Sequence, residues 1–239
     1  MPPMPPSTAR RPASATGKAE FDLPAKTKSE KARAKRILDG LYAAYPDAHC
    51  ELDYTSPHEL LVATILSAQA TDVGVNKATP GLFAAYPTPA DYAAATPKQI
   101  EKYIKTIGLF RNKAKSVHAA MTTVVDDFGG VVPQTMEELL TLRGVARKTA
   151  NVVLGNAFGL NQGVVVDTHV MRVGGRFGLT EHEKDAKKIE RDLMALFPRP
   201  HWTMLSHLLI WHGRRCCSAR GAKCHEHPLC RRYCSNAKE

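Results

Sequence analysis

Apolar side chains recur three and four positions apart along almost the whole chain from about residue 29 onward, a spacing typical of amphipathic helices. Four segments begin in the same way, with Ser or Thr as an N-cap and an acid or Gln three residues later, which satisfies free backbone N–H groups. These N-caps are Ser56, Thr88, Thr96 and Thr135. The strand-like run at 164–166 (Val-Val-Val) is too short to found a sheet. We therefore predict an all-α protein of roughly ten helices.

The first 29 residues differ in composition from the rest of the chain. They contain six of the 16 prolines and no acidic residue before Glu20. Such a segment cannot bury enough apolar surface to offset its ordering entropy, so we predict that residues 1–29 form a disordered, basic, Pro-rich arm. Organelle transit peptides also lack acidic residues, but they form an amphipathic helix, and the prolines of this segment argue against one. The arm is favoured, and an organelle-targeted version stays open.

Charge and cysteine content narrow the class of partner. The net charge is +10; residues 1–36 carry nine Lys/Arg against three Asp/Glu, and residues 212–239 carry seven against two. Positive ends suit an anionic polymer, because Lys and Arg contacts to phosphates supply sequence-independent affinity. The alternative is that both ends are simply solvated.

Five of the six cysteines lie between Cys216 and Cys234. So tight a group predicts a metal or iron–sulfur site in a reducing compartment rather than secreted disulfides.

The stretch 142–154 contains the end of one predicted helix, a Gly-containing turn and the start of another. The first helix ends near Leu142, and the second starts near Arg147 with apolar residues on one face. Such a hairpin can clamp a DNA backbone, because the turn exposes N–H groups and the second helix points its positive end at a phosphate. Helix pairs with a Gly turn are also common structural units, so the hairpin alone does not establish DNA binding.

The same stretch reads Leu-x-Gly-Val-x-Arg-Lys-Thr-Ala-Asn-Val-Val-Leu, and residues 166–173 read Val-Asp-Thr-His-Val-x-Arg-Val. Upstream lie Leu-Ser-Ala-Gln-Ala-Thr-Asp (66–72) and Tyr-Ile-Lys-Thr-Ile-Gly-Leu (103–109), and His-Gly-Arg (212–214) precedes the cysteines. In this order the motifs closely resemble the endonuclease III family, over residues 30–234. The resemblance implies an all-α helix–hairpin–helix glycosylase fold, with a DNA cleft between two helical subdomains.

The resemblance also implies a domain organisation. Residues 30–239 form the glycosylase domain. Within it, about 56–160 form a central helical subdomain that ends in the helix–hairpin–helix at 135–158. Residues 30–55 and 161–211 form a second helical subdomain, and 212–239 form a C-terminal metal-cluster loop.

The family excises oxidised pyrimidines from double-stranded DNA and cleaves the abasic site by β-elimination, and the resemblance implies the same activity here. This chemistry needs a nucleophile at the sugar C1′ that can also form a Schiff base, and a Lys amine does both. The resemblance assigns this role to Lys148, at the positive end of a helix that favours the neutral amine. Asp167 is expected to cap the next helix and to stabilise the cationic sugar or accept the Lys148 proton. For His169 we expect structural hydrogen bonding.

Further DNA contacts are implied by the resemblance. Gln69 and Leu109 occupy the family's gap-filling loops, which are needed because the target nucleotide must leave the stack. Leu109 follows a Gly turn, as suits a wedge between bases, although a loop leucine packed onto the core is the alternative. The family usually has Pro at position 143 and Gly at 146, so Ala146 is expected to tolerate a positive φ less well. The hairpin residues expected at DNA are Arg143, Gly144, Val145, Ala146 and Arg147.

The family holds a [4Fe–4S] cluster through the spacing Cys-x6-Cys-x2-Cys-x5-Cys. In this chain the first two positions are cysteines, but His227 stands at the third, and two further cysteines follow it. A zinc site that uses His227 is the alternative. We predict a [4Fe–4S] cluster, with Cys216 spare. Its predicted ligands are Cys217, Cys224, Cys230 and Cys234.

Two other functions stay open at this point. One is a related glycosylase of another base specificity, although the adenine-removing type lacks the lysine that stands here at Lys148. The other is a non-catalytic, metal-stabilised DNA-binding protein, which would not need Lys148 and Asp167 together. No apolar run approaches the ~20 residues of a membrane span. We expect a monomer that binds DNA and no membrane, in the cytoplasm at the nucleoid if the chain is bacterial.

Overall fold

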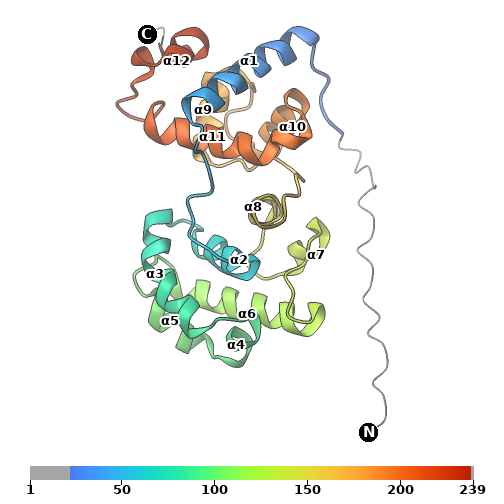
Figure 1. Cartoon of the computed structure of the whole chain (residues 1–239), viewed down its shortest axis with the longest axis vertical. Coiled ribbons are helices and arrows are strands. Elements are labelled where there is room, and N and C mark those ends of the chain that lie inside the picture. The colour runs from blue at the N-terminus through green and yellow to red at the C-terminus, as the bar shows by residue number, and fades with distance from the viewer. Residues whose placement is uncertain (1–21, 238–239) are drawn as a thin grey trace.

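The computed structural model describes residues 22–237, and Figure 1 shows two helical lobes with helix α8 between them. The central lobe contains α2 (Pro57–Leu66), α3 (Asp72–Ala85), α4 (Pro89–Ala94), α5 (Pro97–Ile104), α6 (Phe110–Phe128) and α7 (Met136–Thr141). The cysteine lobe contains α1 (Lys28–Ala44), α9 (Thr168–Arg176), α10 (Ala186–Leu196), α11 (Trp202–Arg215) and α12 (Pro228–Tyr233). Helix α8 spans Arg147–Phe158, and short 3-10 helices lie at Arg199–His201, Cys224–Glu226 and Ser235–Ala237. The described residues contain no strand, which confirms the all-α prediction.

Each of the four predicted N-caps is the residue directly before a helix. The hydroxyls of Ser56, Thr88 and Thr135 accept hydrogen bonds of 3.2–3.4 Å from the backbone N–H three residues later. At Thr96 the Gln99 side-chain oxygen accepts from the Thr96 N–H at 2.7 Å. A cap of this kind stabilises a helix by about 1 kcal/mol, so these local signals determine where the helices begin.

Each lobe has its own apolar core. The core of the central lobe is built from side chains between residues 52 and 154, a single stretch of chain that includes one face of α8. The core of the cysteine lobe comes from two separate stretches, 34–48 and 164–234, and includes the five clustered cysteines. The chain therefore crosses between the lobes twice, once on either side of the central lobe.

Helix α8 joins the two lobes by packing on both. Leu154 is buried in the core of the central lobe. The next residue, Gly155, lies so close to α11 that a Cβ there would overlap the Thr203 side chain. After α8 the chain enters the cysteine lobe, where Val164 and Val166 are buried. The start of α8, which carries the predicted lysine, is thereby fixed relative to both lobes.

The described chain begins with an extended segment that packs on the cysteine lobe. Leu23 contacts that lobe's core, and Lys26 forms an ion pair of 2.9 Å with Asp192 of α10. The predicted arm extended to residue 29, but α1 begins at Lys28, behind a capping box at Thr27. Residues 22–29 therefore belong to the ordered cysteine lobe and not to the predicted arm, because this segment finds partners on α10; residues 1–21 of the predicted arm lie outside the described chain. Among residues 22–237 no helix has the length and apolarity that a bilayer crossing requires.

Candidate functional site

The turn between α7 and α8 is tight because it is built on a glycine. Gly144 has a φ of +85°, in the left-handed region where a side chain is strained. A Cβ at Gly144 would also lie 3.0 Å from the Ser116 Cβ of α6 and 3.5 Å from the Ile65 Cγ2 of α2. Val145 is buried behind the turn. The hairpin thus rests on α2 and α6, and its exposed residues are Arg143, Gly144 and Ala146.

The first turn of α8 presents backbone N–H groups without a side-chain cap. Ala146 is the N-cap residue, and a methyl group cannot accept their hydrogen bonds. Helix ends of this kind bind anions such as phosphate. The φ of Ala146 is −100°, which any Cβ tolerates, so the conflict expected at this position does not arise. The positive φ falls on Gly144 instead.

The side chain of Arg147 is held by an ion pair within the protein. Its Nε donates to the Glu190 carboxylate of α10 at 2.8 Å, and the same carboxylate accepts from Asn151 at 2.9 Å. Glu190 is buried, so loss of Arg147 would leave a buried charge with one partner fewer. A Cβ at Gly163 would overlap this carboxylate. Among the predicted hairpin residues, Arg147 therefore connects α8 to α10, and Arg143 presents the exposed cation.

Lys148 and Asp167 belong to different helices, and both lie near the carboxyl of Asp72. Lys148 is the second residue of α8, and its side chain is exposed. Asp167 is the N-cap of α9; its Oδ1 accepts the Val170 N–H at 2.8 Å. Both side chains act electrostatically on the carboxyl of Asp72, which places all three groups at one site between the lobes.

Asp72, the first residue of α3, is a member of this site that the sequence pattern did not single out. Burial raises the pKa of its carboxyl above the usual range; Lys148 lowers this pKa and Asp167 raises it. The carboxylate also accepts from Arg214 of α11 at 2.7 Å, and Arg214 pairs with Glu51 as well. An acid at the first position of a helix interacts favourably with the helix dipole, and this is sufficient to explain an aspartate here without a functional role. The one sequence signal for such a role was that Asp72 lies three residues after Gln69, in the same motif.

His169 has the structural role expected for it. Its Nδ1 lies 3.1 Å from Nη2 of Arg172, one turn later in α9. Arg172 also donates to the carbonyls of Gly213 at 2.9 Å and Cys217 at 3.0 Å. The pair therefore ties the start of α9, where Asp167 lies, to the end of α11 and the cysteine segment.

The two predicted gap-filling residues have strained backbones. Gln69, with φ +55°, and Leu109, with φ +59°, are the two non-glycine residues of the described chain with positive φ. This conformation costs roughly 1–2 kcal/mol for a residue with a Cβ, and such strain gathers at functional sites. The Leu109 side chain is 60% exposed, so it is not a core-packed leucine. Gln69 follows α2 and Leu109 precedes α6, the helices that the hairpin contacts.

Five cysteines, from the end of α11 to the residue after α12, converge in one buried group. The Sγ atoms of Cys216 and Cys230 are 3.8 Å apart, and those of Cys224 and Cys234 are also 3.8 Å apart. The Sγ of Cys217 lies within 4.8 Å of Cys224 and Cys234. Such a set of thiols can hold a metal ion or a cluster. The structure thus brings the four predicted ligands together and adds Cys216, which was predicted to be spare.

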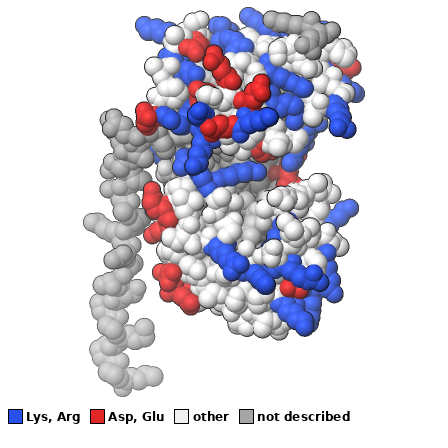
Figure 2. Space-filling model, turned by 180° about the vertical axis from the view of Figure 1, so that it is seen from behind, with Lys and Arg blue, Asp and Glu red and all other residues white. Residues whose placement is uncertain are grey.

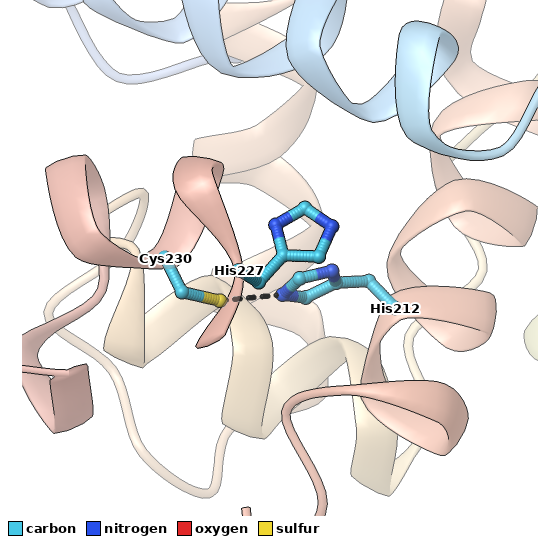
Figure 3. Close-up of side chains that lie close together, drawn as sticks. All are labelled: His212, His227 and Cys230. Carbon is cyan, nitrogen blue, oxygen red and sulfur yellow. Dashed lines mark hydrogen bonds between the residues drawn. The ribbon is translucent and has the colours of Figure 1, made fainter. Parts of the chain in front are cut away.

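Two histidines lie beside Cys230, as Figure 3 shows. The Nε2 of His212 is 3.0 Å from the Cys230 Sγ, and its Nδ1 is 3.0 Å from the Tyr45 hydroxyl. His227 is the N-cap of α12: its Nδ1 accepts the Leu229 N–H at 3.3 Å, and its ring stacks on Tyr45. Because its Nδ1 already caps a helix, His227 has a structural role at the position where the resembling family has a cysteine.

Cationic side chains lie on both lobes and at the waist between them, on the face that Figure 2 shows. Two arginines at the end of α11 are ion-paired on the protein: Arg214 with Asp72 and Glu51, and Arg215 with Glu51 at 3.1 Å. Part of the C-terminal charge is therefore neutralised internally. Within residues 212–237 four other cations are exposed, where they can contact phosphates: Arg220, Lys223, Arg231 and Arg232.

Comparisons with known proteins agree with this geometry. Residues 62–199 match the family described as HhH-GPD superfamily base excision DNA repair protein. Endonuclease III from Synechocystis sp. is 54% identical over 201 residues, which cover 84% of this chain and 91% of that protein. Endonuclease III from Escherichia coli strain K12 is 41% identical over 194 residues, covering 81% of this chain and 91% of that protein.

Solved structures show the same similarity in three dimensions. A trapped covalent intermediate of endonuclease III with DNA has a TM-score of 0.82 at 41% identity, covering 87% of this chain and 97% of that one. A thermostable thymine-DNA glycosylase has a TM-score of 0.78 at 24% identity, covering 88% and 99%. The second likeness concerns the fold alone.

Proposed function

The chain belongs to the HhH-GPD superfamily of base excision DNA repair proteins, and from this premise we propose that it is a bifunctional DNA glycosylase and abasic-site lyase, acting as a monomer. Its proposed substrates are double-stranded DNA with an oxidised pyrimidine and DNA with an abasic site. The observation that carries the proposal is the convergence of Lys148 from α8 and Asp167 from α9 on Asp72. An amine and carboxylates at one site in the waist between the lobes match this chemistry.

Lys148 supplies the nucleophile. Its neutral amine attacks C1′ of the flipped nucleotide, and the bond from C1′ to the base breaks with its electron pair leaving on the base. Opening of the sugar ring then gives a Schiff base between Lys148 and C1′. The Schiff base acidifies the C2′ hydrogens, and loss of one of them expels the 3′ phosphate. Water finally hydrolyses the Schiff base and frees the lysine.

Asp167 supplies a fixed negative charge. Its cap bond to the Val170 N–H holds the carboxylate before substrate arrives, so little reorganisation is needed when positive charge develops on the sugar. A carboxylate in this position also accepts the proton that the Lys148 amine loses during attack. Asp72 brings a second carboxyl to the same site, and its bond to Arg214 orients it.

The hairpin and the two strained loops hold the DNA. The uncapped N–H groups of α8 and the exposed Arg143 bind backbone phosphate. Leu109, already exposed, enters the space that the flipped nucleotide leaves, and Gln69 fills the gap from the other loop.

The buried cysteines fit a thiolate-bound [4Fe–4S] cluster, because they alone supply at least four thiols; His212 and His227 also lie close to Cys230. We propose Cys217, Cys224, Cys230 and Cys234 as the ligands. When bound, the cluster supplies a covalent staple for a segment that has little core of its own. The 3.8 Å between the Sγ atoms of Cys224 and Cys234 matches the edge of a tetrahedron of metal–sulfur bonds about 2.3 Å long, so zinc is the competing occupant. Iron and acid-labile sulfide in equal amounts support the cluster, whereas one zinc per chain contradicts it.

A panel of duplexes tests the proposed activity. Each carries one oxidised pyrimidine, one uracil, one adenine opposite an oxidised guanine, or one abasic site, and each is incubated with the enzyme and borohydride, which reduces a Schiff base to a stable link. Covalent complex is expected on the oxidised pyrimidine and the abasic site. Lys148→Gln should form no complex yet still bind DNA, and Arg143→Gln, the matched control at an exposed cation, should bind more weakly but still form it. Trapping by Lys148→Gln would show that another amine is the nucleophile, and trapping on the adenine duplex alone would change the assigned lesion.

A further inference from the structure

The metal centre contains one thiol more than a four-ligand site requires. Two groups of three cysteines meet at Cys224: one adds Cys217 and Cys234, and the other adds Cys216 and Cys230. All five side chains are at least nine-tenths buried. Cys217, Cys224 and Cys234 therefore form a common triad, and either Cys216 or Cys230 is placed to complete a set of four.

Hydrogen bonds distinguish the two candidates for the fourth position. A metal-bound thiolate can only accept, so a ligated Cys230 accepts from the Nε2–H of His212, 3.0 Å away. His212 Nδ1 then accepts from the Tyr45 hydroxyl at 3.0 Å. The Sγ of Cys216 instead lies 3.7 Å from the carbonyl oxygen of Lys223. A carbonyl can only accept, so Cys216 is the donor and carries its proton.

We propose that Cys216 is a reserve ligand of the metal centre, which takes the place of Cys230 when that thiolate is lost or blocked. In the exchange, the bond from the metal to the Cys230 Sγ breaks and a bond from the metal to the Cys216 Sγ forms. The proton of Cys216 passes to the departing Cys230 thiolate, 3.8 Å away, or to water when Cys230 is alkylated. No electron is transferred. This inference rests on the metal centre proposed above, and it explains why two thiols lie side by side where one ligand suffices.

Four variants of the full chain test the exchange: Cys216→Ala, Cys230→Ala, the double variant and Cys217→Ala. The measurement is metal bound per purified chain, with visible absorbance beside it. Each single change at 216 or 230 should retain metal within about twofold of the wild type, because one thiol still completes the set. The double variant and the control Cys217→Ala should each lose most of it, by tenfold or more. Recovery of Cys230→Ala as metal-free protein, like Cys217→Ala, would overturn the proposal, as would full metal retention by the double variant.

A second measurement leaves Cys230 in place. Wild type and Cys216→Ala, both loaded, are treated with a thiol-alkylating reagent, and metal release to a chelator is followed in time. Release should be several-fold faster from Cys216→Ala, because no thiol replaces Cys230 once it is alkylated, and equal rates would contradict the reserve role. Since the readout is metal per chain, a wild type that contains zinc would overturn the iron–sulfur assignment and leave the reserve ligand standing.

Discussion

Replacement of Leu109 by alanine separates base flipping from folding, and the structure sets the size of each effect. The side chain is 60% exposed, so about two-fifths of it is removed from water. Full burial of a leucine is worth roughly 1.5–3 kcal/mol, and two-fifths of that is about 1 kcal/mol. The site is open to solvent, so no cavity term is added. The free energy of unfolding should therefore fall by about 1 kcal/mol, well below the roughly 2–5 kcal/mol of a core Leu→Ala change.

The effect on excision should be larger and should depend on the substrate. Without the wedge, the space left by the flipped nucleotide stays unfilled, and the cost of unstacking is no longer offset. That cost is a few kcal/mol in a paired duplex and least at a mismatch. We expect the single-turnover rate of excision to fall by about tenfold or more on a normally paired lesion, and by less on the same lesion opposite a mismatched base.

The assay compares single-turnover excision on both duplexes with chemical denaturation of the same samples. Val131→Ala is the matched control: Val131 is 62% exposed and lies just beyond the opposite end of α6, so excision should not change. Leu109→Gly removes the left-handed strain along with the wedge, and should lose excision without losing stability. A loss of stability of 2 kcal/mol or more in Leu109→Ala, or equal losses of excision on both duplexes, would refute the assignment of a wedge.

Three further predictions follow from single contacts. Asp167→Asn keeps a capping oxygen and removes the charge, so single-turnover excision should fall about 10²-fold with the melting temperature nearly unchanged; normal excision would leave Asp167 a cap only. Gly144→Ala meets both a φ of +85° and side chains of α2 and α6, whereas Gly129→Ala meets a φ of +61° in open space. Gly144→Ala should therefore cost more unfolding free energy in denaturation, and an equal cost would mean that the hairpin is not tightly packed. Burial lowers the pKa of His207 from 6.5 to about 4. The neutral, buried imidazole therefore contributes its full stability above pH 6.5, and this contribution is lost as the pH falls towards 4. Over this range the melting temperature of His207→Gln should decline less than that of the wild type. Equal declines in the two proteins would show that His207 does not have the lowered pKa.

Local signals predicted the helices well. The caps at Ser56 and Thr135 lie within a few residues of the groups they bind, so the sequence carries nearly all the information about where those helices begin. Lys148 and Asp167 were predicted as catalytic residues for a related reason, because each lies inside a short motif that depends little on distant packing.

Long-range contacts explain what the sequence did not reveal. The ion pair of Arg147 could not be predicted, because its partner Glu190 comes 43 residues later and no local pattern connects the two. Asp72 was not predicted as a site residue, because an acid is common at the first position of a helix. Only the fold brings Lys148 and Asp167 near it. The spacing of the cysteines predicted that Cys216 is not a ligand. Spacing along the chain does not determine which sulfur atoms lie close together in space, and the fold places Cys216 beside Cys230.

The order in which the chain is made bears on the two cores. The central lobe is one continuous stretch, so it can close on itself while later residues are still being synthesised. The other lobe joins α1, among the first parts made, to cysteines near the end of the chain. Helix α1 must therefore wait for nearly the whole protein before its apolar face is covered. A ribosome stalled after residue 200 would present a finished central lobe beside a first helix that still lacks its partners α11 and α12, and that helix is where we expect chaperones to bind during translation.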